Sequence, residues 1–364
     1  MTTSTAASAE EIAALRDSVR EVIRRRGDRA LRTAIESPTR TDVELWSTLC
    51  EQVGVAGLAV PEAFGGAGVT WLETAAVVEE LGRALASIPM LSSAVLATGA
   101  LMLSGDDAAC ELILPDLAEG SRRATLCWAS EHDWNRSGIV ADAGLLSGTA
   151  DYVIDGESAD VLVIVAGSAF DTRPSTLHHV DADAPGVEIT ALPVLDPTRP
   201  MARVTFTDVA ATAVPSDSAI FARLRTLAWA LLAVEQVGAA SAALDLTVEY
   251  TKSRKQFGRV IGSFQALKHR MADMYADVET SRSIAYAAVE AIVTGSADAN
   301  ELAASAHVYC SEAFRRVTGE AIQLHGGIGI TWEHDIQLYF KRAQSTAQLF
   351  GQPHEVVAAL SASL

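Results

Sequence analysis

The spacing of apolar residues changes twice along the chain, and this change limits the folds that it can adopt. In the first third, Leu15, Val19 and Val22 lie three or four positions apart, which is the spacing of one helix face. The middle third instead contains short apolar runs separated by Gly, Pro and Asp, as between β-strands. Long stripes with helical spacing return in the last third. The sequence therefore predicts helices, then a β-rich region, then helices again.

We expect an α+β protein that is mostly α, in three domains. Residues 1–118 are predicted to form an N-terminal helical domain, 119–215 a middle β-barrel or β-sandwich with antiparallel strands, and 216–364 a C-terminal four-helix bundle. One bundle helix is expected to start near Asp298 and to stop at Gly326. Strands are expected at Ala124–Trp128, Tyr152–Ile154, Val161–Val165, Val187–Thr190 and Val204–Phe206, with Val161–Val165 central because both of its faces are apolar.

Charge and composition argue against several classes of function. A net charge of −18 repels nucleic acid and anionic lipid, so neither nucleic acid nor a membrane is expected as a partner. The segment Met1–Glu11 has the character of neither a signal peptide nor a transit peptide, so we expect a cytoplasmic protein. No metal site is predicted, and reduced thiols are expected, because metal-ligand and CxxC spacings are missing from the cysteines Cys50, Cys110, Cys127 and Cys310.

Two polar segments in the last third suggest a site for a phosphate-bearing ligand. In Tyr250–Gly258, Arg254 is expected at the end of a long helix, where a guanidinium can hold a phosphate through two parallel hydrogen bonds. In Gln323–Gly329, the pair Gly326 and Gly327 lets a ligand approach backbone N–H groups closely. Taken separately, the first segment is also explained by a solvated helix end, and the second by a glycine that ends a helix.

Taken together, in this order and at this spacing, the two segments resemble the acyl-CoA dehydrogenase family. That family has the patterns Y-x-x-x-R-x-x-F-G-x-x-I-x-x-F/H-Q and Q-x-x-G-G-x-G, and Pro61–Gly68 resembles its P-E-x-x-G-G-x-G loop. The resemblance covers essentially the whole chain. It implies FAD-dependent α,β-desaturation of an acyl-CoA thioester, with an electron-transfer flavoprotein as the electron acceptor.

The resemblance also implies an oligomer, a dimer or a tetramer. In the family, the two segments contact the ADP half of an FAD that a neighbouring subunit holds, and the Arg pairs with the pyrophosphate. Carried over residue by residue, the cofactor contacts fall on Arg254, Gln256, Phe257, Gln265, Gln323, Gly326 and Gly327.

The segments that hold a family member's own flavin depart from the family pattern. The loop T-E-P-x-A-G-S-D corresponds to Ala129–Arg136, where Ser130 can replace the Thr hydroxyl but the Gly-Ser-Asp portion is missing. The next flavin segment corresponds to Gly148–Gly156. There, Tyr152 keeps an aromatic ring, whereas Ile154 replaces a hydroxyl that bonds the flavin. The pocket for this chain's own flavin is therefore expected to have lost polar partners.

The family's catalytic Glu is missing as well. Its usual position corresponds to Phe350, and the position used by a minority of members corresponds to Ala228, followed by Trp229 where an Arg is common. Glu235 lies two helical turns after Ala228, about 10 Å along the axis. We therefore favour a buried carboxylate paired with an Arg or with backbone over a relocated base. No catalytic residue is assigned, because no better support exists for Glu355 or His325.

Three interpretations follow from this pattern. The favoured one is the non-catalytic subunit of a heteromeric acyl-CoA dehydrogenase, a type known in bacterial steroid degradation, so a bulky, steroid-derived CoA thioester is the first substrate expected. The second is a homo-oligomeric dehydrogenase with a relocated base. The third is an acyl-CoA-binding protein without redox chemistry.

Overall fold

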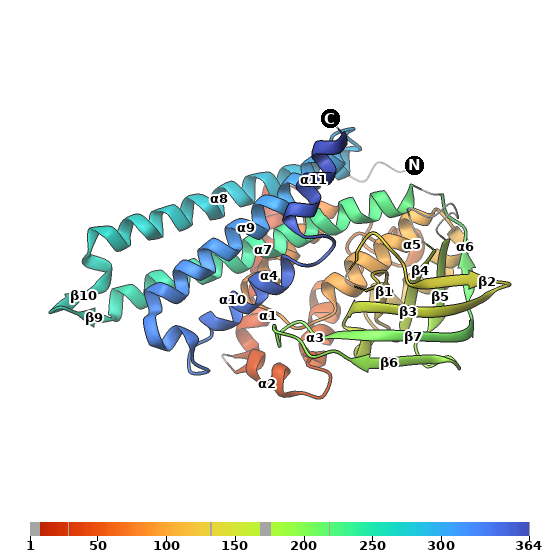
Figure 1. The fold of residues 1–364 in the computed structure, drawn as a ribbon, viewed down its shortest axis with the longest axis horizontal. Helices are drawn as coiled ribbons and strands as arrows, with labels where there is room; N and C mark the ends of the chain where they lie inside the picture. Colours follow the sequence, from red (N-terminus) through yellow and green to blue (C-terminus); the bar gives the residue numbers. More distant parts are fainter. Residues whose placement is uncertain (1–7, 28, 132, 168–175, 218, 364) are drawn as a thin grey trace. The chain divides into compact units, whose positions relative to one another are not determined.

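A computed structural model describes residues 8–27, 29–131, 133–167, 176–217 and 219–363 (Figure 1). The chain forms two compact units. Unit 1 comprises Met1–Val77 and Ser87–Ala228, and unit 2 comprises Val78–Ala86 and Trp229–Leu364. The chain changes unit within two helices, α4 (Trp71–Arg83) and α7 (Ile220–Ser253), and once more in the connection after α4, between Ala86 and Ser87. The predicted mostly α, α+β architecture is confirmed.

The first part of unit 1 is helical, as its apolar spacing predicts. Ser8 begins the first helix with a capping box, since its hydroxyl accepts the Glu11 N–H and the Glu11 carboxylate accepts the Ser8 N–H. The loop Pro61–Gly68 needs its glycine at position 66, because a Cβ there would lie 2.1 Å from the Val60 carbonyl oxygen. Besides the start of α4, the helices are α1 (Ala9–Arg26), α2 (Ala30–Glu36), α3 (Val43–Val53), η1 (Glu62–Phe64), η2 (Met90–Ala97), α5 (Thr98–Ser104) and α6 (Asp107–Glu119).

The rest of unit 1 is a β-sandwich of two four-stranded sheets. One sheet has the order β1 (Ala124–Cys127), β4 (Val161–Ala166), β5 (Thr176–Asp181) and β8 (Thr212–Val214). The other has the order β2 (Ile139–Asp142), β3 (Leu145–Ile154), β7 (Met201–Ala210) and β6 (Val187–Ala191). Residues of both sheets, such as Leu162 and Phe206, share one buried core. A short helix, η3 (Gly156–Ser158), follows β3.

The five predicted strands are present, and the predicted central position of β4 is confirmed. The expectation of purely antiparallel pairing was wrong, because β1 and β4 pair in parallel, with Ala124 opposite Val161. The β2–β3 hairpin lies between these two strands in sequence and belongs to the other sheet. It therefore provides the long crossover that a parallel pair requires.

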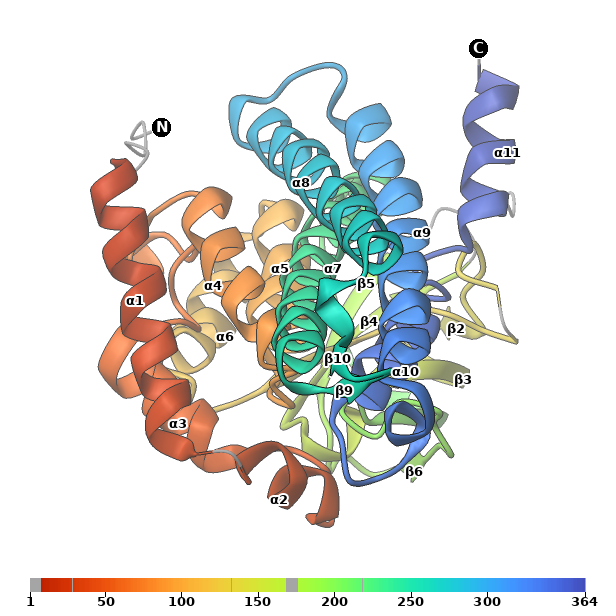
Figure 2. The same cartoon turned by 90° about the vertical axis from the view of Figure 1, so that its left-hand side faces the viewer.

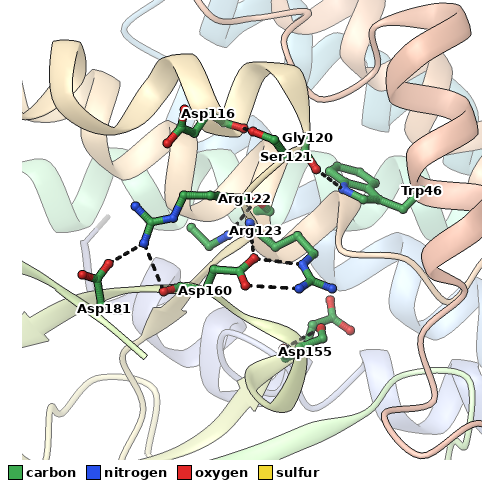
Figure 3. A network of polar contacts seen from close by, with 12 residues as sticks. Trp46, Asp116, Gly120, Ser121, Arg122, Arg123, Asp155, Asp160 and Asp181 are labelled. Atoms are coloured by element: carbon green, nitrogen blue, oxygen red, sulfur yellow. Dashed lines mark hydrogen bonds and ion pairs between the residues drawn. The ribbon is translucent and has the colours of Figure 1, made fainter. Parts of the chain in front are cut away.

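Side-chain hydrogen bonds join the helical part of unit 1 to its sheets at the α6–β1 connection (Figure 3). The Arg123 guanidinium donates to both carboxylate oxygens of Asp160, at 3.0 and 3.2 Å. The same carboxylate accepts the Arg123 backbone N–H at 2.9 Å. Three residues earlier, where α6 ends, the Gly120 carbonyl accepts the Trp46 indole N–H of α3 at 3.1 Å. These hydrogen bonds stabilise the junction between the helices and the sheets of unit 1.

Unit 2 is a helical bundle, as predicted. It contains most of α7, the helices α8 (Gln265–Thr294), α9 (Ala299–His325), α10 (Ile336–Thr346) and α11 (Pro353–Ser363), and the end of α4 (Figure 1). Asp298 and Gly326 flank α9, so both predicted ends are confirmed. Within this unit α4 and α7 cross in backbone contact, because a Cβ at Gly238 would lie 2.0 Å from the Glu79 carbonyl oxygen. By length and composition alone α7 could span a membrane, yet most of it is buried inside the protein, as in a core helix.

Candidate functional site

The seven residues predicted to contact a cofactor gather at one end of unit 2. This end carries the hairpin of β9 (Lys255–Gln256) and β10 (Arg259–Val260), and it faces the viewer in Figure 2. The ends of α7 and α9 meet there, because the Tyr250 and His325 rings stack with centroids 4.4 Å apart. All seven are exposed: Arg254, Gln256 and Phe257 after α7, Gln265 at the start of α8, and Gln323, Gly326 and Gly327 at the end of α9.

The β9–β10 hairpin presents an aromatic ring outward. Its two turn residues, Phe257 and Gly258, have φ values of 53° and 78°, as in the tight turn that favours this strand twist. The Phe257 side chain is 91% exposed, and its ring meets that of Phe264 edge-on, with centroids 6.2 Å apart. The Arg259 guanidinium lies 3.9 Å from the centroid of the same Phe264 ring. The ring is therefore held at the surface by local contacts and is accessible from outside unit 2.

The same end concentrates positive charge on an acidic protein. Residues 250–272 include six Lys or Arg and no Asp or Glu, although the chain carries a net charge of −18. Lys252 and Arg270 are paired with Glu249 and Glu320. Arg254 is exposed where α7 ends, with its backbone held by a hydrogen bond to the Tyr250 carbonyl at 2.9 Å. Such a local cluster of cations favours a phosphate-bearing ligand.

The double glycine leaves the end of α9 open. Gly326 has a φ of 62°, and a Cβ at Gly326 or at Gly327 would meet no atom of the described chain within 4 Å. The short helix η5 (Gly326–Ile330) follows directly. A guanidinium, amide side chains and unobstructed backbone at one end of the bundle fit the needs of the ADP half of a dinucleotide. The residues present here are therefore compatible with the predicted cofactor contact.

The positions predicted to hold the chain's own flavin, in unit 1, are occupied differently. The Tyr152 ring, expected against the flavin, is stacked on Trp134 with centroids 6.3 Å apart. Trp134 is largely buried, and its carbonyl accepts a hydrogen bond from Arg225 at 3.2 Å. Arg225 also donates to the Asn135 side chain at 2.8 Å. These contacts give Tyr152, the ring that was expected to face a flavin, an internal stacking partner.

The other two predicted positions offer little to a flavin. Ser130 exchanges backbone hydrogen bonds with Asp133, at 3.2 and 2.8 Å, in a tight turn. A Cβ at Gly138 would lie 2.4 Å from the Ser130 hydroxyl oxygen, so this hydroxyl faces the backbone of Gly138. Ile154 is buried at the end of β3. His132, in the same loop as Ser130, lies outside the described residues. The side chains of Ser130 and Ile154 do not fit the polar edge of a flavin ring.

At the family's usual base position, Phe350 is only 2% exposed and has a φ of 60°. Two buried side chains hold this turn. The Trp229 indole N–H donates to the Phe350 carbonyl at 3.0 Å, and His307 Nε2 bonds the Gly351 carbonyl at 2.8 Å. The Trp229 and His307 rings stack with centroids 6.0 Å apart. At Phe350, an apolar turn fixed by two hydrogen bonds therefore stands where the family pattern has a carboxylate.

The sequence did not indicate a role for His307, because its position in α9 looks like any other position on the buried face of that helix. Burial lowers the pKa of His307 to about 4, so the imidazole is neutral near pH 7. Because Nε2 donates to the Gly351 carbonyl, Nδ1 carries no proton in the neutral ring. His307 is thus a fixed hydrogen-bond donor to the turn, and its ring stays neutral near pH 7.

Glu235 is paired with a cation, as favoured from the sequence. Its Oε1 lies 2.9 Å from Nη1 of Arg342 on α10, and both side chains are buried. The next residue, Gln236, donates to the hydroxyls of Ser311 and Thr346, at 3.0 and 3.2 Å. The sequence alone did not single out Arg342 as the partner. A carboxylate held by a buried guanidinium is stabilised in its charged form and is poorly suited to remove a proton from a substrate.

The remaining candidates have structural contacts. Ala228, the alternative base position, is fully buried. The exposed Glu355 carboxylate accepts the Gln352 N–H at 2.8 Å, at the start of α11. His325 is buried against Tyr250. None of these three positions in the described chain supplies a carboxylate base.

Comparisons with known proteins agree with the sequence motifs. Residues 9–121 match the family described as "Acyl-CoA dehydrogenase, N-terminal domain", and residues 225–358 match "Acyl-CoA dehydrogenase, C-terminal domain". The chain is 41% identical to the acyl-CoA dehydrogenase IpdE2 of Mycolicibacterium smegmatis, over 98% of this chain and 99% of that protein.

Two solved structures of related proteins have the same fold. A variant of the Tcur3481–Tcur3483 steroid ACAD matches with a TM-score of 0.87 and 30% identity, over 97% of both chains. The ChsE4–ChsE5 complex from Mycobacterium tuberculosis matches with a TM-score of 0.88 and 28% identity, over 98% of this chain and 97% of that one. The chain therefore belongs to the acyl-CoA dehydrogenase family, flavoprotein oxidoreductases that act on acyl-CoA thioesters.

Proposed function

We propose that this chain is the non-catalytic subunit of a heteromeric acyl-CoA dehydrogenase. The observation that carries the proposal is an asymmetry between two sets of residues. The residues that would contact a neighbour's cofactor are present and exposed at one end of unit 2. At the positions expected for the chain's own flavin ring and base, Tyr152 stacks on Trp134, and the buried Phe350 stands where the family pattern has Glu.

In this role the chain completes a cofactor site, and the partner subunit supplies the catalytic base. Arg254 would pair with the pyrophosphate of FAD, and Gln323 and the Gly326–Gly327 backbone would contact its ADP half. FAD, when bound, supplies the hydride acceptor for α,β-desaturation of the thioester. This chain's own contribution is to hold and orient the dinucleotide, because its base positions carry Phe350 and Ala228.

Two related structures support a heteromeric assembly and a steroid-derived substrate. One is the Tcur3481–Tcur3483 steroid ACAD and the other is the ChsE4–ChsE5 complex, so each combines two different proteins. We propose by analogy that this chain pairs with an unlike acyl-CoA dehydrogenase subunit in the cytoplasm. Its substrate would be a bulky, steroid-derived CoA thioester, and an electron-transfer flavoprotein would accept the electrons.

The proposal is tested by co-expressing the chain with flavin-holding acyl-CoA dehydrogenase subunits of the same organism. We expect a stable complex that retains FAD and reduces an electron-accepting dye with a steroid-derived CoA thioester. Arg254→Ala should weaken FAD retention, whereas Arg20→Ala, on the exposed face of α1, should leave it unchanged. Equal retention in both variants would contradict the proposed role of Arg254.

The same experiment separates the two alternatives. A homo-oligomer that binds FAD in every chain and is active alone would support the relocated-base interpretation, which the Glu235–Arg342 pair disfavours. Binding of a CoA thioester by calorimetry, without flavin in any pairing, would support a non-redox binding protein.

A further inference from the structure

We infer that the rings of Tyr250, His325 and His334 form a positioning cluster that sets Arg254 relative to Gly326–Gly327. The inference deepens the proposed function, on which it rests, because it assigns residues that act on the nucleotide only through others. The three rings come from three segments of unit 2: the end of α7, the end of α9 and the loop before α10.

The three rings pack directly on one another. Tyr250 and His325 stack with centroids 4.4 Å apart and planes 21° from parallel. His334 closes the cluster, with its centroid 4.5 Å from that of His325 and 6.2 Å from that of Tyr250, edge-on to the latter. The His325 side chain is 3% exposed, so its ring lies beneath the surface that a ligand would touch.

Hydrogen bonds fix the orientation of the rings. The Tyr250 hydroxyl donates to the His325 carbonyl at 3.3 Å, which satisfies one of the last carbonyls of α9. His325 Nδ1 lies 2.7 Å from the Ala321 carbonyl, so Nδ1 carries the proton. His334 Nδ1 accepts the Ile336 N–H at 3.1 Å. Each imidazole therefore has one tautomer when neutral, and burial lowers the pKa of His325, which favours its neutral form.

Short stretches of backbone connect the cluster to both parts of the predicted cofactor site, Arg254 and the Gly326–Gly327 pair. Tyr250 lies one helical turn before Arg254, whose N–H bonds the Tyr250 carbonyl at 2.9 Å. His325 immediately precedes Gly326, the glycine that ends α9 with a φ of 62°. A shift of the Tyr250–His325 stack would therefore change the spacing between the guanidinium and the open backbone. A single dinucleotide can contact the guanidinium and the glycine backbone together only if the two are held at a fixed separation.

Simple core packing does not account for this choice of residues. Within the described part of the chain, Nε2 of His325 is buried and has no hydrogen-bond partner. A buried polar atom without a partner costs free energy, which an apolar ring of similar size would not. The imidazole is useful here for its fixed Nδ1 hydrogen bond, which sets the ring angle against Tyr250.

The test is a double-mutant cycle on FAD binding by the complex that the chain forms with its flavin-holding subunit. We expect His325→Ala to raise the FAD dissociation constant about tenfold, because neighbouring residues in one network couple on this scale. In an Arg254→Ala background the same substitution should have a clearly smaller effect, because only its action on Gly326–Gly327 remains. His325→Phe restores a ring against Tyr250 and should recover part of the affinity. His354→Ala, exposed on α11, is the matched control.

The outcomes distinguish this inference from the proposed function. If Arg254→Ala leaves FAD affinity unchanged, the proposed function fails and the inference fails with it. If Arg254→Ala weakens FAD but His325→Ala does not, or if the two effects simply add, the positioning role is overturned and the proposed function stands. Should His325→Ala fail to fold, His334→Ala in the half-buried loop gives the same cycle. A ¹⁵N spectrum that places the proton of neutral His325 on Nε2 would also overturn the inference.

Discussion

Glu235 and Arg342 form a buried ion pair between α7 and α10, with 2.9 Å between Oε1 and Nη1. The pair explains why a carboxylate can lie among Leu231, Leu232 and Val234, all fully buried, without acting as a base. A buried carboxylate needs a counter-charge, and Arg342 provides it from the helix that leads to Phe350. Glu235 therefore contributes to the packing of the bundle and is not available to a substrate.

Glu235→Gln should destabilise the protein, because it leaves the Arg342 guanidinium buried without its counter-charge. Removing one partner of a buried pair costs about 3–5 kcal/mol. The free energy of unfolding, measured in urea, should fall by this order. The double variant Glu235→Leu with Arg342→Met should recover much of the loss, since it removes both charges. A Glu235→Gln protein of unchanged stability that fails to turn over substrate would instead identify a catalytic carboxylate.

His307 should make the folded protein sensitive to acid. Burial lowers the pKa of His307 to about 4, whereas an unfolded His titrates near 6.5. The folded state therefore binds fewer protons between these values, and its stability is complete above pH 6.5 and is lost as the pH falls toward 4. The loss amounts to about 3 kcal/mol.

The measurement for His307 is urea unfolding between pH 7.5 and pH 4.5. His307→Gln keeps a donor that can reach the Gly351 carbonyl but does not titrate, so its profile should be flatter than that of the wild type. If both proteins lose stability in parallel as the pH falls, the buried imidazole is not the source.

Trp229→Phe should loosen the turn at Phe350. The substitution keeps a large ring beside His307 but removes the indole N–H that bonds the Phe350 carbonyl. Loss of a donor to a buried group costs about 1–3 kcal/mol. Thermal unfolding should show the lower stability, and the amides of Phe350 and Gly351 should exchange hydrogen faster. Unchanged exchange at these two amides would show that Trp229 does not hold the turn.

The cysteines should be unreactive in the folded protein. Burial raises the pKa of Cys110 to about 11 and that of Cys310 to about 12, and it also raises the pKa of Cys127. The half-buried Cys50 likewise has its pKa raised to about 12 by burial. Because the thiolate is the reactive form, labelling by Ellman's reagent at pH 8 should be slow until the protein is unfolded in guanidinium. Rapid labelling of one thiol in native protein would contradict this placement.

Much of the fold could be predicted from the sequence because long helices and buried strands leave strong periodic patterns. The boundaries of α9 follow from Asp298 and Gly326, and β4 from an uninterrupted apolar run. The strands β2, β5 and β8 were not predicted. They are three to six residues long and carry residues such as Asp142, His178 and Thr212, which do not stand out from the loops around them.

The site could be predicted only in part, for a different physical reason. Local motifs place Arg254 and Gly326 at helix ends, where the structure has them. Contacts between residues far apart in the sequence, such as Glu235 with Arg342 or Trp229 with Phe350, depend on how helices pack and leave no periodic signal. The family resemblance showed that Phe350 replaces the base, but only the structure shows that Trp229 and His307 hold this turn.

The flavin content of the purified protein shows whether this chain holds its own FAD or serves the FAD of a partner. Absorbance of bound flavin should be measured for the chain alone and for the complex with its unlike subunit, each against protein concentration. We expect that the chain carries no flavin alone and that the complex holds one FAD for each pair of unlike chains. One FAD for every copy of this chain, in an active homo-oligomer, would contradict it.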